Sequence, residues 1–582
     1  MSAFKNDESG AGMTLSLALR RCWWAFIGVG LASGLLNILY LTGSFFMLQV
    51  YDRVLPSHSV PTLVALSLLA LMLYIFQGVF ELGRSRMLTR IAASLDEAMN
   101  VRIFSAMVQL PLRTKVSGDG LQPLRDFDQI RSFLSGMGPP ALFDLPWLPL
   151  YLVICFLFHP VIGWLAIFGV IVLAGLTCLT NAKSSNHSKM TAEAANLRNA
   201  YAMTSQRNAE VINAMGMVSS VSRMWEEKNS SYRALMNNSS DVSNGYATVS
   251  KVFRLALQSA VLAAGALLVM DGAASGGIII AASILTSRAL APVELAIANW
   301  KSFTNARHAW KRTNDLLNAI PENAMPLQLP KPKRSMTVES LAGVAPGGRS
   351  LIFSDVSFAL EAGSAVGVIG MSASGKSSLA RVLLQLWPAA RGTVRFDGAE
   401  LHQWSLDDIG KFIGYLPQDV ELFNGTIAQN IARFADDATP GAIIAAAKAA
   451  RVHELIVRMP KGYETDIGDG GTLLSAGQRQ RIALARALYG DPFLVILDEP
   501  NSNLDAEGEQ ALAEAITSVC ARAGIVLVIA HRPSVLSSVN LVLVMNAGRM
   551  EAFGPKDEVL GRVLRKPERQ LSVVVDVTKA GA

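Results

Sequence analysis

Three long stretches of this 582-residue sequence contain no aspartate, glutamate, lysine or arginine, and they cover residues 22–51, 54–80 and 145–182. A helix that crosses a bilayer needs about 20 apolar residues. The first two stretches therefore predict one membrane span each, and the third is long enough for two. His159 and Pro160, in the middle of the third stretch, indicate a hairpin between its two spans.

Two shorter uncharged runs, 255–270 and 272–287, predict a further pair of spans. We therefore expect an all-α membrane domain over residues 23–318, with six helices near 23–48, 60–81, 141–158, 161–180, 254–271 and 277–298. The composition agrees, because 51% of the residues are hydrophobic and 17% are charged, which argues against a disordered chain and an ordinary soluble enzyme. The formal net charge of +6 is small and indicates no nucleic-acid partner.

The placement of lysine and arginine predicts how the spans are oriented. The stretch between the second and third spans contains Arg84, Arg86, Arg90, Arg102, Arg113, Lys115, Arg125 and Arg131. The short loops after the first, third and fifth spans contain only Arg53. Because loops rich in lysine and arginine stay on the cytoplasmic side, we expect the long loops and both termini to be cytoplasmic.

The character of the sequence changes near residue 320. A linker over 319–335 is indicated by four prolines and a short basic run, namely Pro321, Pro326, Pro330, Pro332, Lys331, Lys333 and Arg334. Apolar β-rich runs then alternate with helical segments, a pattern typical of an α/β domain with a parallel sheet. We place this domain at 336–565, between the linker and a tail at 566–582, and assign 1–22 to a cytoplasmic N-terminal segment.

A glycine-rich phosphate-binding motif follows the predicted strand Ala365–Ile369. Residues 370–377 match G-x-x-x-x-G-K-[ST] between a strand and a helix. In such a loop the backbone N–H groups point at phosphate oxygens, and the N-terminal end of the helix adds positive charge. We expect Lys376 to reach the β- and γ-phosphates and the Ser377 hydroxyl to bind Mg²⁺. The residues assigned to ATP are Gly370, Met371, Ser372, Ala373, Ser374, Gly375, Lys376, Ser377 and Ser378.

A second element of the same chemistry lies about 120 residues later. The apolar run Phe493–Leu497 predicts a buried strand that ends in two carboxylates, Asp498 and Glu499. Asp498 lies where a P-loop nucleoside triphosphatase needs an aspartate to hold Mg²⁺. Glu499 follows at the end of the strand, and we expect it to polarise the attacking water.

Between these two elements, a small polar loop leads into a predicted helix over 479–489. The loop consists of Leu474, Ser475, Ala476, Gly477 and Gln478. A loop of this kind at a helix N-terminus is another anion site. With this third motif, the chain from about 335 to 560 resembles the ATP-binding cassette (ABC) family, whose signature usually reads L-S-G-G-Q. Ala476 replaces the first glycine of that pair.

The resemblance implies further roles. Gln418 matches the glutamine that couples the site to the membrane part and contacts Mg²⁺, Asp505 matches the D-loop aspartate, and His531 matches the histidine at the γ-phosphate. Glu499, His531 and Gln418 are therefore the catalytic candidates. Asp469 resembles the acidic residue before the signature. Ala345 stands where the family places an aromatic ring against adenine, and Phe353 is our candidate substitute.

The resemblance also implies an assembly. In this family the P-loop of one cassette faces the signature of another, and this chain has one of each. We therefore expect a half-transporter that works as a homodimer in the lipid bilayer of the bacterial inner membrane, with ATP and Mg²⁺ as cofactors. ATP hydrolysis would drive export.

Three stretches resemble type I secretion exporters, especially the branch for proteases, lipases and RTX proteins: residues 46–56 (FMLQVYDRVLP), 143–151 (FDLPWLPLY) and 287–294 (SRALAPVE). This resemblance implies an unfolded polypeptide substrate with a C-terminal signal, a periplasmic adaptor and an outer-membrane channel. A lipid or small-molecule exporter is the alternative. A membrane protein that uses the cassette as an ATP switch without transport is the alternative of another class.

Two charged residues, Arg288 and Glu294, fall within the sixth predicted span. Charges at this depth are costly and tend to face a cavity, so we hypothesise that both line the polypeptide path. The alternatives are a shifted span or an ion pair between Arg288 and a carboxylate inside the bundle. The four cysteines, Cys22, Cys155, Cys178 and Cys520, lack the spacing of a disulfide framework or a zinc site.

Overall fold

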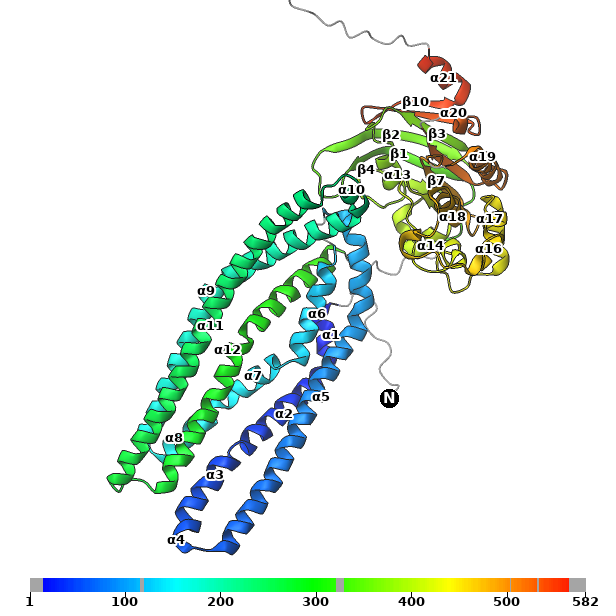
Figure 1. Ribbon diagram of the computed structural model, residues 1–582. Coiled ribbons are helices and arrows are strands. Elements are labelled where there is room, and N and C mark those ends of the chain that lie inside the picture. The colour runs from blue at the N-terminus through cyan, green and yellow to red at the C-terminus, as the bar shows by residue number, and fades with distance from the viewer. Residues whose placement is uncertain (1–13, 116–119, 321–328, 503, 531–532, 565–582) are drawn as a thin grey trace, which may run out of the picture. The chain divides into compact units, whose positions relative to one another are not determined.

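The computed structural model describes residues 14–115, 120–320, 329–502, 504–530 and 533–564. The chain divides into two compact units (Figure 1). A membrane unit comprises residues 1–111 and 116–322, and a nucleotide-binding unit comprises residues 112–115 and 323–582. Within the described residues the first unit is helical and the second combines helices with two sheets.

Within the described residues, six helical stretches of the membrane unit are long and apolar enough to cross a membrane, which confirms the predicted six-helix architecture. We number them spans 1 to 6; they cover Trp23–Ser57, Val60–Arg113, Gly138–Phe158, Pro160–Thr180, Val218–Met270 and Gly276–Ala319. Three other helices complete the unit: α1 (Leu15–Arg21), α6 (Gln122–Ser135) and α10 (Ala209–Ala214).

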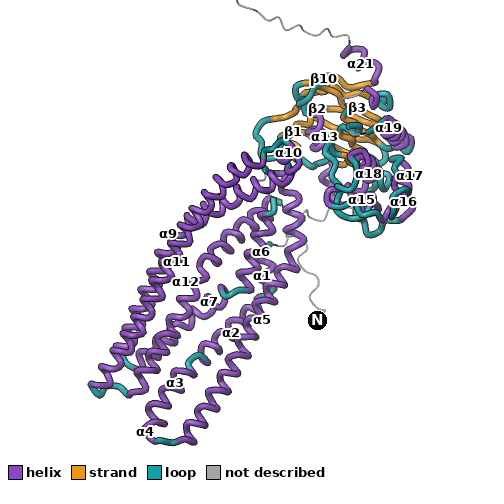
Figure 2. The backbone as a smooth tube through the Cα atoms, viewed as in Figure 1, coloured by secondary structure: helices purple, strands orange, loops and turns teal. Residues whose placement is uncertain are grey.

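Four helices of the membrane unit are longer than a bilayer requires, and Figure 2 shows their long courses. They are α5 (Val60–Arg113), α9 (Pro160–Arg207), α11 (Val218–Met270) and α12 (Gly276–Ala319). Even α12, with 44 residues, is about 66 Å long at 1.5 Å per residue, against about 30 Å of hydrocarbon. In α5 the buried residues Leu88, Ile91, Leu95 and Met99 recur every three or four positions, so one apolar stripe keeps the extension packed.

Span 1 is not a single regular helix. It consists of α2 (Trp23–Leu39), α3 (Thr42–Gln49), the π-helix η1 (Val50–Val54) and the short α4 (Leu55–Ser57). A turn at Tyr40 and Leu41 separates α2 from α3. Span 3 is also composite, with α7 (Gly138–Asp144), the 3₁₀-helix η2 (Leu145–Trp147) and α8 (Leu148–Phe158).

A group of buried polar side chains, which we call the Arg84–Asp144 network, joins spans 1, 2 and 3. Arg84 Nη1 donates to both carboxylate oxygens of Asp144, at 2.9 and 3.1 Å, and to Ser33 Oγ at 3.1 Å. Asn37 Nδ2 donates to Asp144 Oδ1 at 3.0 Å, and the Tyr151 hydroxyl donates to Asn37 Oδ1 at 2.9 Å. All five residues are buried, and the charge pair is compensated by hydrogen bonds with Ser33 and Asn37 of α2.

The nucleotide-binding unit contains a four-stranded antiparallel sheet and a six-stranded sheet. The smaller sheet has the order β2-β1-β4-β5, with strands Leu351–Glu361, Ser335–Val344, Ala389–Phe396 and Ala399–Glu400. The larger sheet has the order β10-β9-β3-β8-β7-β6, with strands Arg549–Pro555, Leu541–Asn546, Ala365–Gly370, Ile525–Ile529, Leu494–Asp498 and Ile413–Leu416. All of its pairs are parallel except β9–β10.

Strands β7 and β8 are buried along their whole length, which explains their unbroken apolar sequence. In the parallel part of this sheet, the carboxyl ends of β3, β7 and β6 meet at one edge, where α/β proteins place their ligands. The helices are α13 (Lys376–Leu383), α14 (Leu406–Lys411), α15 (Ile427–Ile431), α16 (Pro440–Ala449), α17 (His453–Val457), α18 (Ala476–Leu488), α19 (Ala506–Ala521), α20 (Pro533–Leu536) and α21 (Lys556–Leu564).

Candidate nucleotide site

The glycine-rich loop between β3 and α13 has a backbone that its sequence makes possible. Gly370 and Gly375 have φ values of 153° and 94°, a region that glycine enters readily. A side chain on Gly370 would also meet the carbonyl oxygen of Met545 at 2.1 Å. Ala373 adopts φ 63° although it has a Cβ, a strain of the kind that gathers at ligand-binding loops.

Lys376 is folded back onto this loop. Its Nζ donates to the carbonyl oxygens of Gly370 at 2.9 Å and Met371 at 2.8 Å, and only 5% of the residue is exposed. Burial lowers the pKa of Lys376, and the nearby carboxylates of Glu499 and Asp498 oppose that shift. The ammonium group is thus held at the loop whose N–H groups bind phosphate, where a phosphate oxygen can replace a carbonyl partner.

Asp498 meets this loop through Ser377. The Ser377 hydroxyl donates to Asp498 Oδ1 at 3.1 Å. Asp498 is 1% exposed, and its Oδ2 is buried with no hydrogen-bond partner among the described residues. Burial raises the pKa of Asp498. A hydroxyl and an unsatisfied carboxylate oxygen are the hard ligands that Mg²⁺ prefers, so this pair fits the predicted magnesium position.

Glu499 lies one residue beyond, in a constrained backbone conformation. Its φ is 51°, and its N–H donates to the carbonyl of Ile529 on β8 at 3.0 Å. Gln418 Nε2 donates to Glu499 Oε2 at 3.1 Å. The structure therefore brings together the predicted Gln418, Lys376, Ser377, Asp498 and Glu499 at the carboxyl edge of the larger sheet.

The signature residues lie at the N-terminal end of α18, where Ser475 and Ala476 are exposed and Leu474 is buried. Ser475 is the N-cap, its hydroxyl accepts from Gln478 N–H at 3.3 Å, and Gln478 Oε1 accepts from Ser475 N–H at 2.9 Å. This reciprocal pair is a capping box. Ala476 is the first residue of the helix and has an ordinary α conformation. The backbone at position 476 therefore does not require the glycine that the family usually has there, since its φ is not left-handed.

Asp505 has a structural partner in the same part of the unit. It is the N-cap of α19, where its Oδ1 accepts from Gly508 N–H at 2.9 Å and from Arg481 Nη2 at 2.7 Å. The Gly508 N–H and the Arg481 guanidinium lower the pKa of Asp505. Arg481 belongs to α18, so Asp505 connects the signature helix to the segment after Glu499.

Three of the predicted positions receive no support, for two different reasons. His531 lies outside the described residues, as does the side chain of Asp469. The suggestion that Phe353 stacks on adenine is wrong, because Phe353 is 1% exposed and belongs to the core beneath the P-loop helix. A ring packed there has no face free for a base.

Sequence reasoning missed an arginine that joins the site's elements. Arg433 donates to four backbone carbonyls: Arg486 O at 3.0 Å, Ala487 O at 3.1 Å, Gly410 O at 2.8 Å and Ile413 O at 3.0 Å. The first two lie in the last turn of α18, and Ile413 begins β6, which leads to Gln418. No sequence motif identifies Arg433, because its acceptors are backbone carbonyls, which every residue type has.

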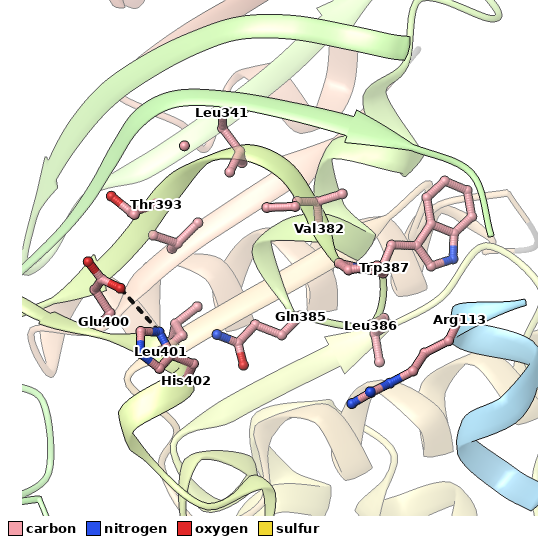
Figure 3. Close-up of a pocket in the computed structure, with 14 residues that line it drawn as sticks. Arg113, Leu341, Val382, Gln385, Leu386, Trp387, Thr393, Glu400, Leu401 and His402 are labelled. Carbon is pink, nitrogen blue, oxygen red and sulfur yellow. Dashed lines mark ion pairs between the residues drawn. The ribbon is translucent and has the colours of Figure 1, made fainter. Parts of the chain in front are cut away.

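A separate pocket of the nucleotide-binding unit lies away from these residues (Figure 3). It is lined by Leu341, Val382, Gln385, Trp387, Thr393 and Leu401, among others. His402 and Glu400 form an ion pair at its edge, with 3.1 Å between Nδ1 and Oε2. The pocket contains none of the predicted ATP residues.

In the membrane unit the two predicted path residues have different surroundings. Arg288 is exposed, and its guanidinium lies over the Tyr40 ring, 5.0 Å from the ring centroid. Glu294 is partly buried and pairs with Arg254 of α11, at 2.7 Å between Oε1 and Nε. The Glu294 carboxylate is thus paired with a cation of the same chain, whereas the Arg288 guanidinium is exposed and lies over an aromatic ring.

Comparison with known proteins agrees with this geometry. Residues 26–292 match the ABC transporter transmembrane region, and residues 353–502 match the ABC transporter family. The type I secretion system ATP-binding protein PrsD of Rhizobium meliloti (strain 1021) is 65% identical over 98% of this chain and 99% of its own length. The exotoxin translocation ATP-binding protein PaxB of Pasteurella aerogenes is 28% identical over 92% of this chain and 76% of its own length.

Among solved structures, a bacterial Atm1-family ABC exporter with ATP bound has the same fold, with a TM-score of 0.80. It is 22% identical, and the match covers 93% of this chain and 96% of the other. The membrane domain, the nucleotide-binding domain and the full-length match to PrsD agree with one another. This chain belongs to the ABC exporters of type I secretion systems, which couple ATP hydrolysis to transport.

Proposed function

We propose that two copies of this chain form a transporter in the bacterial inner membrane. The nucleotide-binding unit and both termini would be cytoplasmic, and the short loops after spans 1, 3 and 5 would lie outside. Two features support the dimer. The chain has one P-loop and one signature, and Ser475 and Ala476 of the signature are exposed at the start of α18. A partner's P-loop can therefore reach it.

The proposed substrate is an unfolded polypeptide with a C-terminal signal. The transporter would work with a periplasmic adaptor and an outer-membrane channel. The 65% identity to a type I secretion protein over nearly the whole length supports this assignment. The resemblance of residues 46–56 and 143–151 to type I exporters points the same way.

The site residues would have different roles in ATP hydrolysis. When bound, Mg²⁺ would supply positive charge beside the phosphates, held by Ser377, Asp498 and Gln418. The N–H groups of residues 370–378 and the ammonium of Lys376 would bind the phosphate oxygens of ATP. Glu499 would accept a hydrogen bond from the attacking water. The water oxygen bonds to the γ-phosphorus, the bond from that phosphorus to the bridging oxygen breaks, and ADP leaves with the bridging oxygen.

The partner copy would complete the site. The N-terminal end of its α18, with the residues Leu474, Ser475, Ala476, Gly477 and Gln478, would face the γ-phosphate of the ATP on the first copy. His531 would contact the same phosphate, and Asp505 would align α19 with α18. Closure around ATP would move the helical extensions of the spans and switch access outward.

The observation that carries this function is the unsatisfied oxygen of Asp498 beside Ser377 and the Glu499–Gln418 pair. Its test is a comparison of secreted proteins from strains with the wild-type chain and with Lys376→Ala. We expect a defined set of extracellular proteins to disappear in the variant. Lys448→Ala, which changes an exposed lysine of α16, should leave that set intact. An unchanged secretome for Lys376→Ala would refute the proposal.

We also propose that Arg288 lines the polypeptide path. It is exposed within span 6 and rests on Tyr40 of span 1, as expected of an intramembrane charge that faces a cavity. Arg288→Gln should reduce secretion of the same set of proteins while basal ATP hydrolysis continues. Arg223→Gln, at an exposed position of α11, is the control. Normal secretion by Arg288→Gln would contradict the role. Glu294, which pairs with Arg254, has less support as a path residue.

A further inference from the structure

An exposed carboxylate ties one end of span 1 to the start of span 6. Asp52 lies in the π-helix η1 near the short-loop end of span 1. Its Oδ2 accepts from the Ser275 hydroxyl at 2.5 Å, and its Oδ1 accepts from the Gly277 N–H at 2.8 Å. Ser275 is the N-cap of α12 and makes no side-chain cap bond of its own. Asp52 therefore caps a helix that begins more than 220 residues later.

Span 1 also packs on α7 and α12, and a second polar contact between span 1 and other helices is of a different kind. The Arg84–Asp144 network holds α2 through Ser33 and Asn37, and all of its members are buried. Breaking a buried charge pair leaves an uncompensated charge, which is strongly unfavourable. The Asp52 side chain is exposed, and its bond to Ser275 lies at the surface, whereas its bond to the Gly277 N–H is partly buried. Water can therefore replace the bond to Ser275 at little cost.

Span 1 is interrupted between these two contacts. Asn37 of the network lies in α2, Asp52 lies in η1, and the turn at Tyr40 and Leu41 separates the two parts. The break ends the regular helix, and the π-helix adds a second irregular turn beside Asp52. The outer half of span 1, residues 42–57, thus follows an irregular turn, packs along α12 and carries the Asp52 contact near its tip.

We propose that Asp52 is a latch, which holds the outer half of span 1 against span 6 and releases it during export. The segment would swing about the turn at Tyr40 and Leu41, while the Arg84–Asp144 network keeps α2 in place. This inference uses the orientation proposed above, in which the short loops lie outside. Release of the latch would then open the path on the side where the polypeptide leaves.

The close fit at Gly277 agrees with a latch that can be opened by a small change. A Cβ on Gly277 would lie 2.6 Å from Asp52 Oδ1, whereas a Cβ on the preceding Gly276 would meet nothing within 4 Å. A methyl group at Gly277 therefore displaces the carboxylate without altering Asp52 itself. The two neighbouring glycines form a matched pair for the test.

The first experiment locks the latch. Asp52→Cys and Ser275→Cys are combined in a full-length chain whose native cysteines are replaced, and an oxidant cross-links them in cells. The probe is the set of extracellular proteins that Lys376→Ala abolishes. We expect cross-linking to reduce their secretion at least tenfold and a reductant to restore it. Secretion that continues after complete cross-linking would overturn the latch.

A second cross-link controls for general damage. Native Cys155 of span 3 lies beside Thr286 of span 6, so Thr286→Cys allows a bond between two helices that the proposal leaves together. This cross-link should leave secretion within about twofold of the reduced protein. An equal block by both cross-links would also overturn the proposal, because the tie at Asp52 would then have no special role.

The second experiment opens the latch and does not depend on the substrate. Basal ATP hydrolysis is measured for Gly277→Ala and Gly276→Ala proteins in liposomes. We expect Gly277→Ala to hydrolyse about fivefold faster than Gly276→Ala, the scale of losing one helix cap, because the closed outer end is no longer favoured. Equal rates would refute the latch. This readout remains valid even if the secretome test of Lys376→Ala fails.

Discussion

Two aspartates in the two units have nearly the same burial and opposite surroundings. Asp144 in the membrane unit is 4% exposed, and Arg84 and Asn37 donate to its carboxylate. Asp498 in the nucleotide-binding unit is 1% exposed, and one of its oxygens has no partner among the described residues. A buried carboxylate whose oxygens all have hydrogen-bond partners stabilises the fold. A buried carboxylate oxygen without a partner indicates a ligand-binding site.

The first prediction concerns the unsatisfied member of this comparison. Asp498→Asn should lower the rate of ATP hydrolysis about 1,000-fold, because electrostatic stabilisation of phosphoryl transfer depends on the metal position. The thermal midpoint without nucleotide should stay the same or rise. Burial raises the pKa of Asp498, which means that the folded protein disfavours the charged form that Asn removes. A fall of several degrees would contradict a ligand-binding role.

The second prediction concerns the satisfied member. Asp144→Asn leaves Arg84 as an unpaired buried charge, which should destabilise the membrane unit by about 3–5 kcal/mol. The thermal midpoint of the purified protein in detergent measures this effect. Asp96→Asn is the control, since Asp96 pairs with Arg131 at the surface, where such pairs contribute about 0–1 kcal/mol. Equal shifts would mean that the Arg84–Asp144 network is not a structural attachment.

The third prediction asks whether Arg433 only stabilises the fold, as Asp144 does, or also positions the residues of the nucleotide site. Arg433→Met removes four hydrogen bonds, two to α18, one to β6 and one to Gly410 of α14. We expect kcat to fall about tenfold, as when positioning is lost without loss of binding, while the dissociation constant for ATP stays unchanged. Arg433→Lys should recover part of the rate. Parallel losses of ATP binding and thermal stability would indicate a structural role only.

The smallest effect is expected at the signature. Ala476→Gly restores the residue that the family usually carries, but Ala476 occupies an ordinary first helical position. Its methyl group therefore imposes no backbone strain, and ATP hydrolysis should change by less than about twofold, because glycine at a helix end costs only a few tenths of a kcal/mol. A large gain in rate would show that the methyl group hinders the partner's ATP.

Much of this protein was predictable from short patterns. Uncharged runs of about 20 residues predict six spans, because a bilayer sets the length of a helix that crosses it. The strand, glycine-rich loop and helix around Lys376 predict a phosphate site, because that geometry needs only neighbouring residues. The meeting of Asp498 and Ser377 was expected because both match the positions that hold Mg²⁺ in P-loop nucleoside triphosphatases.

Other contacts left no such pattern. Arg433 donates only to backbone carbonyls, which every residue carries. Residues 46–56 and 143–151 resemble type I exporters. Their sequence does not predict that Asp52 accepts a hydrogen bond from α12 or that Asp144 pairs with Arg84. Phe353 was the candidate to replace the aromatic ring missing at Ala345, but its side chain is packed in the hydrophobic core.

The sequence by itself determined the number of spans, the family and the residues around the phosphates, because each depends on local length, spacing or backbone geometry. Only the tertiary structure decided which buried carboxylate has partners for its charge and which retains an oxygen without a partner among the described residues. That distinction depends on hydrogen bonds between residues 60 to 121 positions apart. The packing of the folded helices and strands sets those distances.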